Sequence, residues 1–187
     1  MNDEKVVKTI FKENKGRSLV NFFAINEKFT GAGFPNSFLD IELSHFRQVL
    51  NVNIVSLFSV NREFIRNNSS GTIVNISSIY GVVSPNPKLY SGGEKPIPYG
   101  VSKAAVIQLS KHLATHAAPN FRVNSVVIGG VLESQGERFI TEYSSNVPLG
   151  RMANSEEIVG VIKFLSTNAS SYITGSVVTV DGGWTAW

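Results

Sequence analysis

The chain has 187 residues, of which 42% are hydrophobic and 17% are charged, and it contains no cysteine. These proportions are typical of one globular domain with a sizeable core, and they exclude disulfides and thiolate metal sites. The formal net charge is +3 with scattered basic residues, so we expect no nucleic-acid partner. No apolar run reaches the ~20 residues of a membrane span and the first residues are charged, which favours a cytoplasmic protein without a membrane partner.

The first part of the chain alternates between amphipathic and apolar segments. Apolar side chains share one stripe before residues 14–16, which predicts a helix that ends there. Residues 18–25 form a short apolar run without alternation, as expected for a strand buried on both faces of a parallel sheet. From Ser44 to Asn67, apolar side chains recur at steps of three and four residues, which predicts a long helix with Asn53 inside its apolar stripe.

The second part continues this alternation. Its predicted elements are a strand at 71–76, a loop at 81–98, a helix at 99–117, a strand at 122–128, a loop from 129, a helix that Ser155 caps and that runs to 165, and a strand at 176–180. Strand and helix alternate throughout, and no linker divides the chain. We therefore predict one α/β domain, residues 1–187, with a doubly wound parallel sheet.

Tyr99 and Lys103 lie four residues apart on a predicted helix, so their side chains emerge on the same face. Such a pair occurs often by chance, and a solvated lysine beside a half-buried tyrosine is its ordinary interpretation. Here the helix follows a strand that ends in Ser77 and Ser78, and ligands of open parallel sheets bind at the carboxyl ends of strands. We therefore expect the serines and the tyrosine–lysine pair to converge on one crevice.

Eight segments, in order and at sensible spacing, resemble the short-chain dehydrogenase/reductase family. They are VLNVNIVSLF, GTIVNISSIYG, YGVSKAAVIQLSKHLA, RVNSVVIGGV, PLGRM, EEIVGVIKFL, SYITGSVVTVDGG and, more loosely, LVNFFAIN. The resemblance implies a Rossmann-like sheet and an oxidoreductase that transfers a hydride between NAD or NADP and a carbonyl or alcohol substrate. It also implies that Asn53, Ser78, Tyr99 and Lys103 occupy the catalytic positions.

The chemistry of these residue types suits that reaction. A phenol has an unperturbed pKa near ~10, so Tyr99 needs a neighbouring cation before it can exchange a proton at neutral pH. We expect Lys103 and the oxidised nicotinamide to supply this charge, and we expect Lys103 to bind the nicotinamide ribose. By resemblance, Ser78 orients the reacting oxygen and Asn53 holds a water that relays protons to Lys103.

The resemblance also implies contacts with the cofactor. They are made by Asn21, Ala24, Ile76, Tyr99, Lys103, Gly129 and Val131. Residues 129–130 resemble the family's Pro-Gly turn, with Ile128 where the proline is expected, and the Val131 backbone would meet the nicotinamide carboxamide. Residues 181–183 resemble an element that supports subunit contacts.

The chain departs from the family on its amino-terminal side. Family members open with a glycine-rich turn that holds the cofactor pyrophosphate at a helix amino terminus, and nothing in this sequence resembles that turn. If residues 19–26 are the family's fourth strand, the first three strands are lacking. We therefore expect this chain alone to bind NAD or NADP weakly. The exposed edge of that strand requires either a partner chain or a local structure that differs from the family's.

Ser78 and Tyr99 are separated by 21 positions, more than is usual in the family. The additional loop, NPKLYSGGEKPI, resembles a subgroup associated with the modification of surface-glycan and flagellin sugars. Its residues Tyr90, Glu94 and Lys95 could hydrogen-bond a hydroxylated small-molecule substrate. A surface loop without a role in substrate binding explains the same residues equally well.

Two functions are consistent with the sequence. The first is an oxidoreductase that acts on a sugar-like alcohol or ketone. The second is a truncated, noncatalytic remnant that serves as an oligomerisation or binding module. In either case we expect a homo-oligomer in which the helices that contain Asn53 and Tyr99 pair across a two-fold axis. We expect no metal site, because His112 and His116 have ligand spacing but no third ligand accompanies them.

Overall fold

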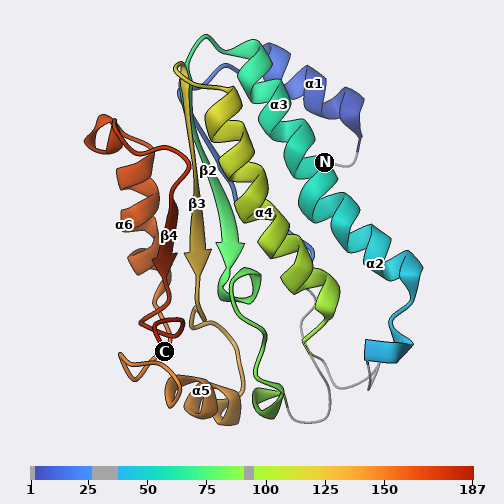
Figure 1. The fold of residues 1–187 in the computed structure, drawn as a ribbon, viewed down its shortest axis with the longest axis vertical. Coiled ribbons are helices and arrows are strands. Elements are labelled where there is room, and N and C mark those ends of the chain that lie inside the picture. Colours follow the sequence, from blue (N-terminus) through green and yellow to red (C-terminus); the bar gives the residue numbers. More distant parts are fainter. Residues whose placement is uncertain (1–2, 27–37, 91–94) are drawn as a thin grey trace.

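The computed structural model describes residues 3–26, 38–90 and 95–187. At its centre is a parallel sheet of four strands in the order β1-β2-β3-β4 (Figure 1). The strands are β1 (Ser18–Asn21), β2 (Gly71–Ser78), β3 (Phe121–Ile128) and β4 (Val177–Val180). Each strand pairs with its neighbour in the sequence. Because all strands are parallel, their carboxyl ends meet at one edge of the sheet.

Helices surround this sheet. They are α1 (Glu4–Glu13), α2 (Leu43–Leu50), α3 (Leu57–Asn67), α4 (Ile97–His116), α5 (Glu137–Ser144) and α6 (Ser155–Leu165). Figure 1 shows α3 and α4 on one face of the sheet and α6 on the other. Val74 and Val126 pack in an apolar cluster with α6, whereas Ile73 and Val123 pack with α3 and α4. Strands buried on both sides explain the apolar runs in the sequence and confirm the predicted α/β class.

The long helix predicted from Ser44 consists of three parts. A π-helical turn, η2 (Asn51–Ser56), joins α2 to α3 and contains Asn53. Such a turn widens the regular hydrogen-bond ladder and often occurs at functional positions. The apolar periodicity of the sequence gave no sign of this turn.

Other elements also differ from the sequence prediction. β1 ends at Asn21, Phe22 beyond it is 61% exposed, and within β1 only Asn21 is buried. The prediction of a strand over residues 18–25 that is buried on both faces was therefore wrong in both length and burial, because β1 lies at the edge of the sheet. The predicted loop after residue 129 contains α5. Helix α6 is capped by Asn154 rather than by Ser155, because Asn154 and Glu157 exchange side-chain and backbone hydrogen bonds in a capping box.

Buried amides connect the sheet to its helices. The Nδ2 atom of Asn21 donates to Oδ1 of Asn61 at 2.9 Å and to Oδ1 of Asn75 at 2.8 Å. Nδ2 of Asn75 donates to Oγ of Ser110 at 3.0 Å. The network thus joins β1, α3, β2 and α4. No helix among the described residues is long and apolar enough to cross a membrane.

We predict that Asn75→Ala lowers the free energy of unfolding by about 2–4 kcal/mol, since it removes two hydrogen bonds and leaves buried polar partners unsatisfied. Urea denaturation would measure the change. Asn14→Ala is a matched control, because the exposed Asn14 amide donates only to the Ile10 carbonyl at the end of α1. Equal losses of stability in the two variants would contradict the structural importance of the buried network.

Candidate active site

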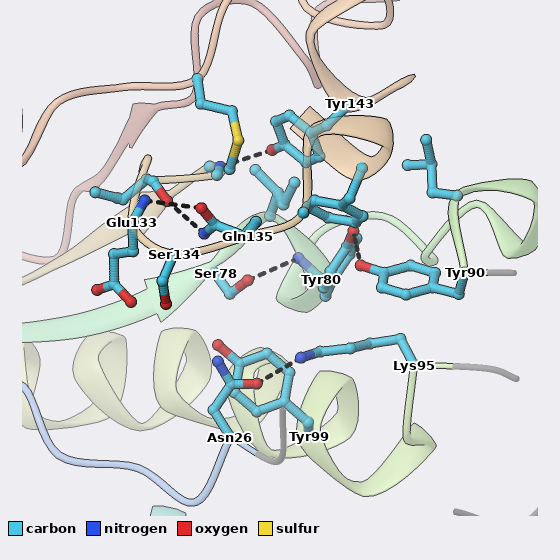
Figure 2. Close-up of a pocket in the computed structure, with 18 residues that line it drawn as sticks. Asn26, Ser78, Tyr80, Tyr90, Lys95, Tyr99, Glu133, Ser134, Gln135 and Tyr143 are labelled. Atoms are coloured by element: carbon cyan, nitrogen blue, oxygen red, sulfur yellow. Dashed lines mark hydrogen bonds between the residues drawn. The ribbon is translucent and has the colours of Figure 1, made fainter. Parts of the chain in front are cut away.

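A cavity of about 580 Å³ opens where β2 and β3 end (Figure 2). Its lining includes Ser78 from β2, Tyr99 from the first turn of α4, and residues 129–131 from the segment after β3. The register of the sheet places Ser78 beside Ile128, so the two strands lead into the same space. The cavity therefore lies where ligands bind in open parallel sheets.

Ser78 and Tyr99 lie in contact inside this cavity. Burial raises the pKa of Tyr99, and a hydrogen bond with the Ser78 side chain opposes that rise. The Ser78 oxygen also accepts a hydrogen bond from the Tyr80 backbone N–H at 3.2 Å. Because that bond uses an oxygen lone pair, the Ser78 hydroxyl proton remains available to the Tyr99 oxygen. The pair can thus exchange a proton with a third oxygen placed between them.

Lys103 lies beneath Tyr99 and is 5% exposed. Its Nζ atom is 5.7 Å from the centre of the Tyr99 ring and donates to the Ile76 carbonyl of β2 at 2.9 Å. Burial lowers the pKa of Lys103 to about 8, so the ammonium group is mostly charged at neutral pH. The lysine therefore provides a fixed positive charge beside the phenol, anchored on the backbone of the sheet.

Asn53 positions α4. Its Oδ1 accepts from the Ile25 N–H at 2.7 Å, and its Nδ2 donates to the Ile25 carbonyl at 3.1 Å and to Ser102 Oγ at 2.9 Å. Ser102 Oγ in turn donates to the Tyr99 carbonyl at 2.7 Å. The amide thus links the segment after β1 to the turn of α4 that carries Tyr99. The water relay from Asn53 to Lys103 stays a prediction.

Three residues bring α4 close to β2 and to the turn at residues 79–81 that follows it. The sequence placed Ser77 near the site but gave no role to Gly81 or Gly100. Ser77 Oγ donates to the Lys103 carbonyl at 2.7 Å. A Cβ atom on Gly81 would lie 2.6 Å from the Lys103 carbonyl carbon. A Cβ atom on Gly100 would lie 2.9 Å from the backbone carbonyl oxygen of Tyr80. Only glycine permits this approach of backbone to backbone. The signal in the sequence is that each of these glycines follows a tyrosine at the proposed site.

The predicted cofactor contacts on β1 and β2 occupy different environments. Asn21 is buried and its amide belongs to the network inside the sheet. Ala24 is half-buried in the segment after β1. Ile76 buries its side chain, while its carbonyl accepts the Lys103 ammonium proton. Ile76 is thus hydrogen-bonded to Lys103 through its backbone carbonyl. Contact of Asn21, Ala24 and Ile76 with a cofactor stays a prediction.

The predicted contacts after β3 lie on the cavity wall. The Gly129 N–H donates to the Val180 carbonyl at 3.0 Å, and a Cβ atom on Gly129 would lie 2.9 Å from the Cα atom of Asp181. Val131 pairs with Ala153 in an isolated parallel bridge. The turn is therefore held from β4 on one side and from the segment before α6 on the other.

Of the loop residues predicted to contact substrate, Tyr90 and Lys95 lie among the described residues. Tyr90 lines the cavity, its hydroxyl shares a hydrogen bond with that of Tyr80, and burial raises its pKa to about 12. Nζ of Lys95 lies 4.7 Å from the centre of the Tyr99 ring. Figure 2 shows Lys95 and Tyr99 on one side of the cavity, with Tyr80 and Tyr90 on the other. Glu94 lies outside the described residues.

The described residues contain no group of three or more His, Cys, Asp or Glu side chains that could hold a metal ion. His112 and His116 lie on the exposed side of α4. Nδ1 of His116 is 2.8 Å from the His112 carbonyl oxygen, one helical turn away. This local hydrogen bond accounts for the spacing of the two histidines.

Comparisons with known proteins identify the family. A family model described as Enoyl-(Acyl carrier protein) reductase matches residues 3–185. The uncharacterized short-chain type dehydrogenase/reductase y4vI of Sinorhizobium fredii is 36% identical over 78% of this chain. D-arabinitol 2-dehydrogenase (ribulose-forming) of Candida tropicalis is 32% identical over the whole chain, which covers 68% of that relative. This chain therefore belongs to the short-chain dehydrogenase/reductase family.

Other matches qualify the resemblance. The post-translational flagellin modification protein A of Campylobacter coli is 32% identical over 72% of this chain, in agreement with the subgroup that the loop resembles. The chain spans only 27% of the length of y4vI and 55% of the length of the flagellin modification protein. A short-chain dehydrogenase from Leptospira borgpetersenii, solved with bound NAD+, is 33% identical with a TM-score of 0.88. The match covers 98% of this chain and 72% of that one, which confirms the Rossmann-like fold.

We predict that the charge of Lys103 destabilises the folded chain below pH 8. Its pKa is 10.5 when unfolded and about 8 when folded, and at ~1.36 kcal/mol per pKa unit the penalty is about 3 kcal/mol. Between pH 8 and 10.5 the unfolded chain binds more protons, so the penalty disappears as the pH rises. Lys103→Met removes the charge. Its stability advantage over the wild type should therefore be largest below pH 8 and shrink by about 3 kcal/mol toward pH 10.5.

Denaturant unfolding at several pH values between 7 and 10.5 would measure this difference. Lys111→Met is the matched control, because Lys111 is exposed on the same helix. A stability difference between Lys103→Met and the wild type that stays constant over this pH range would contradict the effect of charge burial.

Proposed function

We propose that this chain carries the hydride-transfer site of an NAD- or NADP-dependent short-chain oxidoreductase that acts on a small carbonyl or alcohol. The observation that carries the proposal is that Ser78 and Tyr99 line one cavity, with the charged Lys103 buried beside the phenol. A buried cation next to a phenol is costly for stability and useful for proton transfer.

The proton steps belong to residues of this chain. Because burial raises the pKa of Tyr99, its phenol is protonated near neutral pH, which is the form that donates a proton in carbonyl reduction. Ser78 would donate a hydrogen bond to the same substrate oxygen and orient it. Lys103 would stabilise the phenolate that remains after the transfer. Asn53 acts as a positioning residue, through Ser102 and the first turn of α4.

The cavity suits the nicotinamide half of the cofactor. When bound, the nicotinamide supplies or accepts the hydride. Lys103 would hold its ribose, and the backbone of residues 129–131, which lines the cavity, would meet its carboxamide. A phosphate-binding glycine turn does not occur at a helix amino terminus among the described residues, and residues 31–33 lie outside them. The described residues therefore offer no such support for the adenosine half.

The substrate is proposed to be a hydroxylated small molecule. The hydroxyl groups of Tyr80 and Tyr90 and the ammonium group of Lys95 line the cavity around Tyr99. Similarity to a dehydrogenase named for D-arabinitol supports a sugar-like alcohol or ketone. Such a substrate carries several hydroxyl groups that would pair with these polar atoms.

We also propose a homo-oligomer. Apolar side chains are exposed on the helices predicted to pair between subunits, among them Val55 of η2, Phe58 of α3 and Val101 of α4. Burial of these side chains in a subunit contact would remove apolar surface from water. In the described part of the chain β1 is an edge strand, and its cover by another chain stays a prediction. A cytoplasmic location and a single partial domain over residues 1–187 likewise stay predictions.

The alternative is a noncatalytic remnant that serves as an oligomerisation or binding module. One observation favours it: apolar side chains are exposed on the helices that are proposed to pair between subunits. The oxidoreductase remains the better proposal, because a noncatalytic module gains nothing from a buried charged lysine beside a tyrosine.

We predict that Tyr99→Phe lowers kcat by about 100- to 10,000-fold, since it removes the proton donor and keeps the ring. The rate would be measured as NADH or NADPH consumption with a panel of polyols and ketoses, and circular dichroism would verify the fold. Tyr172→Phe is the matched control, because Tyr172 is 103% exposed. Turnover that is unchanged in Tyr99→Phe would exclude the proposed mechanism.

We predict that the chain alone binds NADH far more weakly than an intact family member. Charge-assisted hydrogen bonds contribute roughly 1.5–3 kcal/mol each, so two missing phosphate contacts would weaken binding by about two to four powers of ten. Calorimetric titration of the folded chain, with an intact relative as reference, would measure the affinity. Micromolar binding by this chain would show that another segment recognises the phosphates.

A further inference from the structure

We propose that Tyr143 of α5 is a positioning residue for the turn formed by Gly129, Gly130 and Val131. Its hydroxyl holds the backbone wall that faces the nicotinamide. The effect on cofactor binding rests on the function proposed above, whereas the support of the turn is a property of the chain itself.

The contact is a direct hydrogen bond. The Gly130 backbone N–H donates to the Tyr143 hydroxyl oxygen at 2.6 Å. Tyr143 is 3% exposed, and burial raises its pKa, so its phenol remains neutral and its oxygen can accept this bond. Figure 2 shows the hydroxyl pointing to this turn from the side of α5.

The ring of Tyr143 occupies the space that a side chain at position 130 would need. A Cβ atom on Gly130 would lie 2.7 Å from two carbon atoms of the Tyr143 ring. Two consecutive glycines have the largest conformational freedom of any pair of residues, so a defined turn at residues 129–130 requires contacts from outside. Tyr143 supplies both a hydrogen bond and a packing surface for it.

The ring of Tyr143 is itself held in place by the carboxy-terminal segment of the chain. Trp184 stacks on Tyr143 with ring centres 4.4 Å apart and an angle of 17° between planes. The Asp181 carboxylate accepts hydrogen bonds from the Gly183 N–H at 2.9 Å and from the Thr185 N–H and hydroxyl at 2.8 and 2.7 Å. These bonds fix the turn that leads to Trp184. The segment therefore supports the cavity wall within the same chain, in addition to the predicted subunit role of residues 181–183.

The position of the turn matters because it lines the same cavity as Ser78 and Tyr99. A displacement of a binding wall by about 1 Å is enough to impair a hydride-transfer geometry strongly. Loss of the Tyr143 hydroxyl would free the Gly130 N–H and loosen this wall, while the ring and its stacking on Trp184 would remain.

The first test measures the turn directly, without ligand. In Tyr143→Phe we expect amide hydrogen exchange at Gly130, followed by NMR, to accelerate at least about fivefold, as expected for a hydrogen bond of ~1 kcal/mol. Exchange in the central strands should not change. Tyr172→Phe, altered at an exposed tyrosine, should exchange like the wild type. Unchanged exchange at Gly130 in Tyr143→Phe would overturn the inference.

The second test measures the consequence for the nicotinamide. NMR titration with nicotinamide mononucleotide should give a Kd about fivefold higher for Tyr143→Phe than for the wild type. The Kd of ADP-ribose, which lacks the nicotinamide, should be the same for both. Gly130→Ala should show the same selective loss, because its methyl group would displace the Tyr143 ring.

Equal nicotinamide mononucleotide affinity in wild type and Tyr143→Phe would overturn the positioning role. An equal loss of affinity for both ligands would also overturn it, because that result indicates general damage to the fold. If the wild type binds neither ligand, the proposed function fails for this chain, and the exchange rate at Gly130 still decides whether Tyr143 supports the turn.

Discussion

Ser77, near the end of β2, donates a hydrogen bond to the Lys103 carbonyl, and Gly81, in the turn that follows β2, has no side chain that would separate this turn from α4. This close approach of helix to strand sets the geometry of the candidate site. It brings the Lys103 ammonium within reach of the Ile76 carbonyl and places the Tyr99 phenol against Ser78. A larger residue at position 81 would move Lys103 away from the Ile76 carbonyl and Tyr99 away from Ser78.

The same approach has an energetic cost. Lys103 is buried without an acidic partner among its described contacts, so the fold carries a desolvated charge. The fold tolerates this charge because other hydrogen bonds hold the strands and the helix around Lys103 in place. Asn75 connects β2 to β1 and α4, and Asn53 connects the segment after β1 to the turn that carries Tyr99. Retention of a costly charge in a rigid frame is typical of a functional site.

The parallel sheet then brings two separate walls together. Because β2 and β3 pair in register up to Ser78 and Ile128, the serine and the glycine turn that follows Ile128 open into one space. One wall is fixed by α4. The other is held by β4 and by the segment before α6, and Tyr143 and Trp184 pack behind it. A site of this kind depends on packing between segments that are distant in the sequence.

The sequence by itself determined the α/β alternation, the buried strands, the family and the pairing of Tyr99 with Lys103 on one helix face. Each of these follows from local periodicity or from segments whose residues are close in the chain. Only the tertiary structure decided the partners of Asn53, the end of β1, the existence of α5 and the contact of Tyr143 with the glycine turn. The reason is physical: periodicity reports which face of a segment is buried, whereas the choice of hydrogen-bond partner depends on which distant segment lies against that face.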